Sequence, residues 1–216
     1  MIPKKITTVL FDWDGTLCDS GAVHFRTFSA MLADFGITFT REQFKAVYTP
    51  AWYRMYEAFG LPREVWPQAD ARWLFHYGEH TADLLPGAAE AVQTLLAAGL
   101  RLGIVTGGNR GRIVRELALP GLTAAFPALV CHEDVVRKKP HPEGIEKALA
   151  ALGASPAASC YVGDTPEDIQ MGKDAGVFTV AVMTDYVERS RLETCGADVL
   201  IENIAELPGV LPRILA

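Results

Sequence analysis

The stretch FDWDGT, at residues 11–16, places two carboxylates around one tryptophan, directly before a glycine and a threonine. It follows the β-branched run from Ile6 to Phe11, which is typical of a buried strand. Carboxylates this close repel each other, so the turn is difficult to place unless a cation lies beside it. The alternative interpretation is that Asp14 or Asp19 only caps the helix that follows.

Short runs of the same kind recur along the rest of the chain and are separated by helical patterns. Strands that alternate with helices form parallel sheets with crossover connections. The sequence therefore predicts an α/β fold whose core is a doubly wound, Rossmann-like parallel sheet. After the first run, the predicted strands are Arg101 to Val105, Ala128 to Cys131, Ser159 to Val162, Val177 to Val182, and Asp198 to Ile201.

The segment from Leu17 to Leu85 is the exception, because it contains no convincing strand pattern. Large aromatic residues recur there at helical spacing, which predicts an all-helical insert. We expect residues 1–17 and 85–216 to form the core and residues 18–84 to form a helical cap. After the cap, Pro86 fits the first turn of a helix and Gly99 fits the residue just past its end.

The aromatic residues of the insert have two interpretations. Stripes of this kind usually pack helices together, which is the interpretation we favour, and the alternative is that they line a pocket. The residues are Trp52, Tyr56, Phe59, Trp66, Trp73 and Tyr77. Polar residues that could contact the far end of a ligand are Arg54, Arg63, Arg72, His76 and His80. We expect no catalytic role for His24, His132 and His141.

Composition and charge exclude several classes of protein. The chain has 216 residues, half of them hydrophobic, and a formal net charge of −6, which argues against a binder of nucleic acid or of an anionic membrane. The apolar run at the N-terminus stops at Asp12 without a small-residue cleavage site, and no apolar stretch is long enough for a membrane span. We therefore expect a cytoplasmic protein.

Two further motifs follow predicted strands. In GIVTGGNR, Thr106 ends the second strand, and Gly107 and Gly108 let the backbone approach a ligand before a helix begins near Asn109. A hydroxyl beside the N–H groups of a helix N-terminus forms an anion site, although Thr-Gly-Gly is also an ordinary turn. In RKKPHPEG, Lys139 precedes two prolines, and the alternative is a solvated basic turn.

The last motif, YVGDTPEDIQ, runs from a strand into Asp164 and then, one helical turn later, Asp168. These two residues can face one pocket, although acidic residues at a helix start are often simple caps. All these motifs follow strands of one predicted parallel sheet, so they can converge at its carboxyl edge. A cleft with Asp12, Asp14, Asp164 and Asp168 needs a divalent cation, and an all-oxygen ligand set indicates Mg²⁺.

The order and identity of these motifs resemble those of the haloacid dehalogenase-like hydrolases, within their phosphatase branch with a helical cap, which includes phosphoglycolate phosphatase-like enzymes. The motifs that carry the resemblance are DWDGT at residues 12–16, Thr106, Lys139 in KPHP, and GDTPED at residues 163–168. The resemblance implies a phosphoric monoester hydrolase that acts on a small phosphorylated metabolite.

The resemblance also implies roles for the site residues. Asp12 is the expected nucleophile that forms an aspartyl-phosphate, and Asp14 is the expected general acid and base. Thr106 and the Gly107 N–H are expected to hold phosphoryl oxygens. Lys139 is expected to offset negative charge on the nucleophile and the transferred group.

The metal ligands follow from the same resemblance. Mg²⁺ would be bound by Asp12, the Asp14 carbonyl and Asp164, while Asp168 is either a water-mediated ligand or the residue that orients Lys139. The alternatives are a sugar-phosphate mutase of the same superfamily and a non-catalytic phosphate-binding protein. Either a monomer or a homodimer is compatible with the sequence.

Overall fold

The computed structural model describes residues 5–78, 80 and 82–215. Its centre is a six-stranded parallel sheet with the strand order β3-β2-β1-β4-β5-β6. The strands are β1 (Thr8–Phe11), β2 (Arg101–Val105), β3 (Ala128–Val130), β4 (Ser159–Gly163), β5 (Phe178–Val182) and β6 (Val199–Ile201). The order changes direction between β1 and β4, which makes this edge of the sheet the expected ligand position in a doubly wound fold. The predicted fold class is confirmed.

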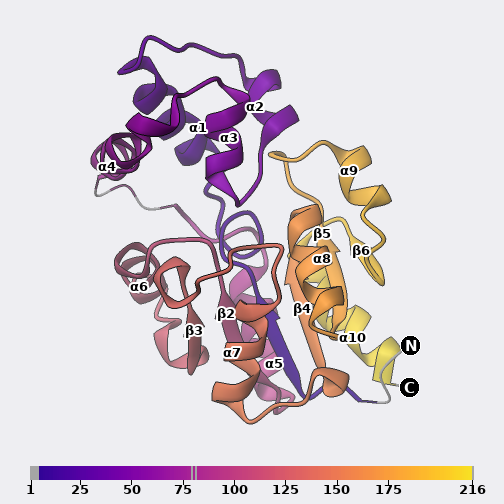
Figure 1. Cartoon of the computed structure of the whole chain (residues 1–216). Coiled ribbons are helices and arrows are strands. Elements are labelled where there is room, and N and C mark those ends of the chain that lie inside the picture. Colours follow the sequence, from indigo (N-terminus) through magenta and orange to yellow (C-terminus); the bar gives the residue numbers. More distant parts are fainter. Residues whose placement is uncertain (1–4, 79, 81, 216) are drawn as a thin grey trace.

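Helices cover both faces of the sheet (Figure 1). Alternate strand residues point to opposite faces, so Leu10 packs with α7 and α8 while Val9 and Phe11 pack with α5, α6 and α10. These helices are α5 (Ala88–Ala97), α6 (Arg110–Ala118), α7 (Glu143–Leu152), α8 (Pro166–Asp174) and α10 (Leu207–Leu215), and α9 (Arg189–Thr194) lies between β5 and β6 in the chain. No helix in the described part of the chain is long and apolar enough to cross a membrane.

The predicted helical insert is also found. Within residues 18–84 the described elements are α1 (Gly21–Ala33), α2 (Arg41–Val47), α3 (Trp52–Ala58) and α4 (Trp66–Tyr77), with a short 3₁₀ helix at Arg63–Val65. In Figure 1 these helices gather beyond one end of the sheet. Their apolar core continues onto Tyr186 and Val187, which follow β5. The side chain of Thr49 donates a hydrogen bond to Glu167 of α8 at 2.9 Å, so a polar contact also joins the insert to the core.

The two connections of the insert run beside each other. Asp19 N donates to the Asp83 carbonyl at 2.8 Å, and Leu85 N donates to the Leu17 carbonyl at 2.9 Å. Between these bonds, Cys18 and Leu84 form an antiparallel bridge. The insert therefore enters and leaves the core at one point, directly after the residue 11–16 turn.

Element boundaries differ from the sequence predictions in a few places. Helix α5 begins at Ala88 rather than at Pro86, because its N-cap Gly87 has a φ of +79° and turns the chain before the helix starts. Gly99, with a φ of +80°, does lie just past the end of that helix, as predicted. β1 begins at Thr8, two residues later than predicted, and the other strand ends agree within one residue.

Candidate functional site

The carboxyl edge of the sheet brings together the residues that the sequence singled out. Asp12 follows β1, Thr106 follows β2 and Asp164 follows β4, and these three strands are neighbours. Backbone hydrogen bonds fix two of these positions, since Asp12 N donates to the Val162 carbonyl and Thr106 N to the Val130 carbonyl, each at 2.9 Å. The predicted convergence of the strand-end motifs is therefore present in the structure.

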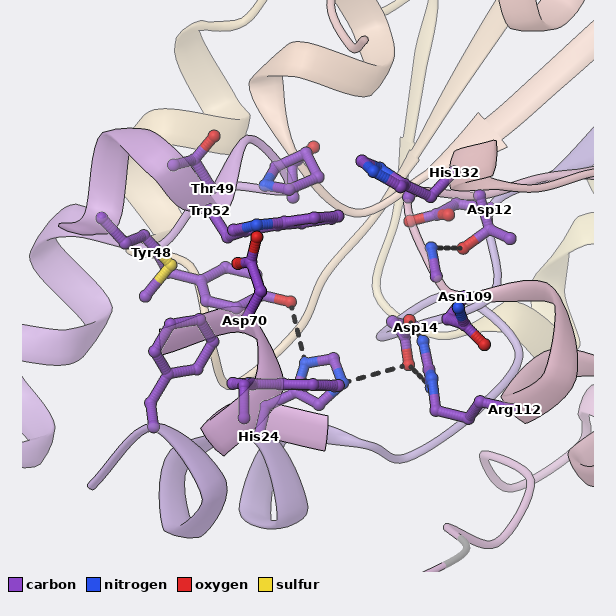
Figure 2. A pocket seen from close by; sticks show the side chains of 18 of the residues that line it. Asp12, Asp14, His24, Tyr48, Thr49, Trp52, Asp70, Asn109, Arg112 and His132 are labelled. Atoms are coloured by element: carbon purple, nitrogen blue, oxygen red, sulfur yellow. Dashed lines mark hydrogen bonds and ion pairs between the residues drawn. The ribbon is translucent and has the colours of Figure 1, made fainter. Parts of the chain in front are cut away.

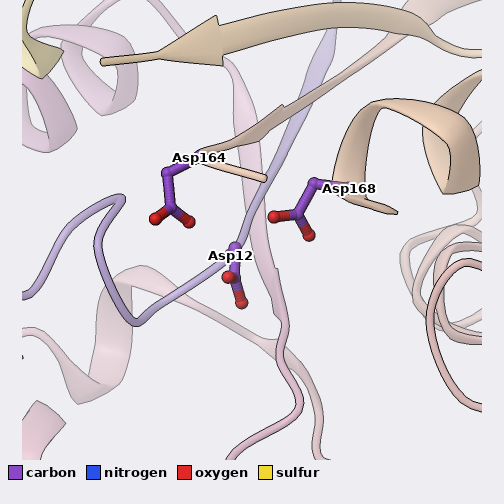
Figure 3. A group of neighbouring side chains, drawn as sticks. All are labelled: Asp12, Asp164 and Asp168. Atoms are coloured by element: carbon purple, nitrogen blue, oxygen red, sulfur yellow. The ribbon is translucent and has the colours of Figure 1, made fainter. Parts of the chain in front are cut away.

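Three buried carboxylates lie close together at this edge (Figure 3). Asp12, Asp164 and Asp168 each offer an oxygen that lies within 4.8 Å of an oxygen of the other two. Thr16 donates its hydroxyl hydrogen to Asp164 Oδ1 at 3.3 Å, whereas Asp164 Oδ2 is buried without a hydrogen-bond partner among the described residues. An unpaired buried carboxylate oxygen is costly, so this donor set fits a hard divalent cation.

The electrostatics of these carboxylates agree with that fit. Burial raises the pKa of Asp12 to about 7, against the influence of Lys139 and with further contributions from Asp168 and Asp14. Burial and the charges of Asp168 and Asp12 raise the pKa of Asp164 well above its usual range. A cation between these groups would favour their ionised forms.

Lys139 provides one positive charge within the cluster. Its Nζ lies 2.8 Å from Asp12 Oδ1 and 2.7 Å from Asp168 Oδ1. Although burial favours the neutral amine, the two carboxylates raise the pKa of Lys139 above its usual range. Lys138 instead donates to the backbone carbonyls of His132 and Val135, so Lys139 is the lysine that reaches the nucleophile candidate.

Asp168 uses both of its oxygens in contacts with protein groups. Oδ1 accepts hydrogen bonds from Lys139 Nζ and from the Tyr161 hydroxyl. Oδ2 accepts from the backbone N–H of Thr165 at 3.1 Å and from its hydroxyl at 2.6 Å, which forms a capping box at the start of α8. This geometry holds the Lys139 ammonium in place.

Gly15 is required by the tightness of the first turn. Its φ is +77°, a conformation that strains any residue with a Cβ, and an added Cβ would lie 2.1 Å from Asp164 Oδ2. The glycine therefore lets the turn approach the carboxylate cluster closely.

Asp14 does not point into the carboxylate cluster but is held by Arg112 of α6 (Figure 2). The guanidinium donates from Nη1 to Oδ1 at 2.8 Å and from Nη2 to Oδ2 at 2.5 Å. Arg112 Nη1 also donates to Glu116 Oε2 at 3.1 Å, and His24 Nε2 lies 3.4 Å from Asp14 Oδ1. Burial opposes ionisation of Asp14, but Arg112 and His24 outweigh it and hold the pKa of Asp14 well below its usual range.

This arginine cluster was not predicted from the sequence. Arg112 and Glu116 are four residues apart in a helix, which suggests only a local ion pair. Glu116 also accepts from Trp13 Nε1 at 2.7 Å and from the Tyr77 hydroxyl at 2.5 Å. Nothing in the local pattern links Arg112 to a residue 98 positions earlier, so no sequence signal could have identified the contact.

The N-terminus of α6 differs in detail from the predicted anion site. Arg110 N donates to Glu133, and Gly111 N donates to the Asn109 side chain, so these first-turn N–H groups are already occupied. Thr106 and Gly107 do line the cavity beside the carboxylates. Of the groups predicted to hold phosphoryl oxygens at this turn, Thr106 and Gly107 are thus placed at the cavity, and their role stays a prediction.

A cavity of about 210 Å³ lies between the sheet edge and the helical insert (Figure 2). Its core-domain wall contains Asp12, Asp14, Thr106, Gly107 and Asp164. The insert contributes mainly aromatic and apolar side chains, including Trp52, Tyr56 and Trp73, which we expected to serve chiefly in helix packing. His24 and His132 also line the cavity, although we expected no catalytic role for either.

The predicted distal contacts lie elsewhere. Arg54 lines a neighbouring cavity. Arg63 pairs with Glu57, and both Arg72 and His76 pair with Asp34. His80 is not among the residues that line either of these two cavities.

Comparisons with known proteins agree with the site. The family model described as haloacid dehalogenase-like hydrolase matches residues 9–182. The chain is 34% identical over 210 residues to the pyrophosphatase PpaX of Anoxybacillus flavithermus. The alignment covers 96% of this chain and 97% of that protein. It is 33% identical over 216 residues to the PpaX of Listeria monocytogenes serotype 4a, with the same coverage.

Solved structures support the fold. A hydrolase from Pseudomonas syringae superposes with a TM-score of 0.84 at 23% identity, covering 97% of this chain and all of that chain. A β-phosphoglucomutase from Clostridium difficile superposes with a TM-score of 0.79 at 18% identity, covering 97% of both chains. Together with the family match over most of the chain, these findings show that the protein belongs to the haloacid dehalogenase-like hydrolases, in their phosphatase branch.

Proposed function

We propose that this protein is a Mg²⁺-dependent phosphatase that hydrolyses a small phosphorylated metabolite through an aspartyl-phosphate on Asp12. The observation that carries the proposal is the position of Asp12. Its carboxylate lies 2.8 Å from Lys139 Nζ, and it lines the same cavity as Thr106 and Gly107. A nucleophile, a fixed positive charge and phosphoryl-binding groups thus meet at one place.

The metal site is assigned to Asp12, Asp164 and the backbone carbonyl of Asp14. The unpaired Asp164 Oδ2 supports this assignment. Since both Asp168 oxygens already accept hydrogen bonds, we assign Asp168 to the positioning of Lys139 rather than to direct ligation. Bound Mg²⁺ would supply a counter-charge for the phosphoryl oxygens and the nucleophile.

The reaction then has two steps. In the first, a carboxylate oxygen of Asp12 attacks phosphorus, the bond from phosphorus to the leaving oxygen breaks, and Asp14 gives its proton to that oxygen. In the second, Asp14 accepts a proton from a water molecule, which attacks the aspartyl-phosphate and releases phosphate. The pairing with Arg112 holds Asp14 as the carboxylate, the form that the second step requires.

The proposal is tested by the Asp12→Asn variant. Phosphate release from a panel of phosphorylated metabolites is measured with Mg²⁺, and unfolding is followed in parallel. Because an amide is neither the nucleophile nor an anionic ligand, we expect kcat to fall by at least about a thousandfold. The matched control is Asp19→Asn, whose carboxylate accepts from Tyr186 and does not line the cavity. Near-normal turnover by Asp12→Asn would contradict the covalent mechanism.

The alternatives give different outcomes in the same panel. A sugar-phosphate mutase would convert a sugar phosphate to its isomer with little release of phosphate. A non-catalytic phosphate-binding protein would bind phosphate without turning over any ester.

A further inference from the structure

We propose that the leaving group of the substrate is a single aromatic or similarly planar apolar ring that carries no second anionic group. This inference rests on the proposed phosphatase function and names the substrate class of the same site. It follows from three properties of the cavity, which are its walls, its size and its lack of available positive charge.

The walls beyond the catalytic carboxylates are largely aromatic and apolar. They come from three helices of the insert, and the residues are Phe28 of α1, Trp52, Met55 and Tyr56 of α3, and Trp73 and Leu74 of α4. Flat side chains offer stacking faces to a planar ligand, and such aromatic contacts are favourable beyond simple burial.

One wall is a ring pair that joins the insert to the core. Trp52 of α3 lies against His132, which follows β3, with ring centroids 4.4 Å apart. In Figure 2 these two rings lie in the upper part of the view, whereas His24 and Arg112 lie in the lower part. Both members of the pair line the cavity, so an inserted ring can contact a surface that the insert and the core build together.

The cavity volume matches a leaving group of about one ring. The volume is about 210 Å³, and it includes the space beside Asp12 where the phosphoryl group must lie. An apolar cavity of roughly 150 Å³ is large enough to hold benzene. The remaining space therefore suits one ring on a short linker to the phosphate oxygen.

The lack of an available positive charge in this cavity argues against a second anionic group on the substrate. Of the described residues that line this cavity, only Arg112 carries a permanent positive charge, and its guanidinium is engaged by Asp14 and Glu116. Asp70 adds a carboxyl group to the wall, with its oxygens accepting from Tyr53 and Tyr56. Beyond the proposed Mg²⁺ beside Asp12 and Asp164, a second phosphate or a carboxylate in the part of the cavity that the insert lines would lose its hydration without gaining an ionic partner.

The basic residues near this cavity do not supply the missing positive charge. Arg137 and Lys138 line the neighbouring cavity, which shares Trp52 and His132 with the first. Arg137 pairs with Glu143, and Lys138 donates to two backbone carbonyls. Arg54 also lines that cavity and is the residue that a longer anionic substrate would have to reach.

The first test compares substrates with similar leaving oxygens. Benzyl phosphate, ethyl phosphate and phosphoglycolate all release an aliphatic alkoxide, so the comparison isolates the group attached to it. We expect kcat/KM with Mg²⁺ to be up to about tenfold higher for benzyl phosphate than for the other two, which is the upper end of the range for one aromatic contact. Pyrophosphate is the fourth substrate and should also be slower than benzyl phosphate, although phosphate is a better leaving group.

The outcomes separate this inference from the function on which it rests. Faster turnover of phosphoglycolate or pyrophosphate than of benzyl phosphate would overturn the inference and leave the phosphatase function intact. The Arg54→Ala variant would then show whether the second anion reaches the neighbouring cavity. No phosphate release from any of the four compounds would overturn both proposals.

The second test changes the wall. Trp52→Ala should lower kcat/KM for benzyl phosphate about tenfold and leave the value for ethyl phosphate within about twofold, whereas Trp52→Phe should restore most of the loss. The control is Phe75→Ala on α4, whose side chain is 71% exposed and lines neither cavity, and this variant should match the wild type for both esters. An equal loss for both esters in Trp52→Ala would overturn the ring-binding role.

Discussion

At the scale of single residues, the proposed mechanism requires Asp14 to be first a proton donor and then a proton acceptor, and Arg112 stabilises the ionised form. The guanidinium makes two parallel hydrogen bonds to the carboxylate, a geometry that favours the ionised form and fixes its orientation. In that mechanism, proton donation from Asp14 to the leaving oxygen requires the Arg112–Asp14 pair to loosen once per turnover.

The Arg112→Lys variant tests the positioning role. Lysine keeps the charge but cannot form two parallel hydrogen bonds, so we expect kcat to fall about tenfold with little change in KM. Arg112→Ala should also lower the free energy of unfolding by about 3–5 kcal/mol, because it leaves buried Asp14 and Glu116 without their cation. The control is Arg110→Lys on the same helix, whose partner Asp134 lies near the surface. Wild-type kcat in Arg112→Lys would contradict the assigned role.

A buried histidine gives a prediction about pH. Burial lowers the pKa of His24 to about 4, below about 6.5 in an unfolded chain. Between these values the unfolded state binds more protons, so His24 lowers the free energy of unfolding as the pH falls from about 6.5 to 4, by up to about 1.4 kcal/mol per pH unit. His24→Asn should remove this contribution, and urea unfolding across that range measures it.

The comparison between wild type and variant is the informative quantity in that experiment. Asp12, whose pKa burial raises to about 7, titrates in the opposite sense, because its folded form binds the extra proton. Its contribution is shared by both proteins and cancels in the difference. Identical pH profiles for the two proteins would contradict the assignment to His24.

At the scale of elements, the turn between β1 and the insert depends on a glycine, and a second glycine provides a matched control. Gly15 and Gly36 have φ values of +77° and +74°, but a Cβ on Gly36 would meet nothing within 4 Å. We expect Gly36→Ala to cost about 1–2 kcal/mol from backbone strain alone. Gly15→Ala should cost more, and it should also weaken Mg²⁺ binding in calorimetry because the new methyl group displaces Asp164. Equal effects of the two substitutions would contradict this account.

The elements of the core could be predicted from the sequence because each strand is a short apolar run with a turn at its end. The same turns carry Asp12, Thr106 and Asp164, so their convergence follows from the topology of a parallel sheet. The contact from Arg112 to Asp14 could not be predicted, because the two residues are 98 positions apart and meet only through the packing of α6 against the residue 11–16 turn. Long-range side-chain pairing leaves no periodic signal in the sequence.

The aromatic residues of the insert show a second limit of sequence patterns. Helical spacing indicates which side of a helix turns away from solvent, but not whether protein atoms or a cavity lie there. Trp66 stacks on Tyr53, as expected for a packing residue. Trp52 and Trp73 line the cavity as well as packing on neighbouring rings. The two interpretations left open by the sequence thus apply together.

At the scale of the whole molecule, a bound cation should stabilise the fold as well as the reaction. Three buried carboxylates repel one another, and Mg²⁺ that binds only the folded state adds about 2.7 kcal/mol at a concentration of 100 times its Kd. We expect EDTA to abolish activity and lower the unfolding midpoint, and Mg²⁺ to restore both. Ca²⁺ should restore less activity because its coordination is larger and more flexible.

The Asp164→Asn variant is the control for that experiment, since it should lose most of the Mg²⁺-dependent rise in the unfolding midpoint. Full activity of the wild type in chelator would rule out the assigned metal site. A midpoint that responds to Mg²⁺ equally in the variant would place the ion elsewhere.

The paired connections at Cys18 and Leu84 also bear on how such a protein can change over generations. Because the segment between them starts and finishes at one short backbone ladder, it is a single insertion between two parts of the core. A genetic exchange of this insertion would alter the cavity walls that the insert contributes, while Asp12, Lys139 and Asp164 would keep their positions at the edge of the sheet. New substrates can then be acquired by recombination of one gene segment, without rebuilding the chemistry.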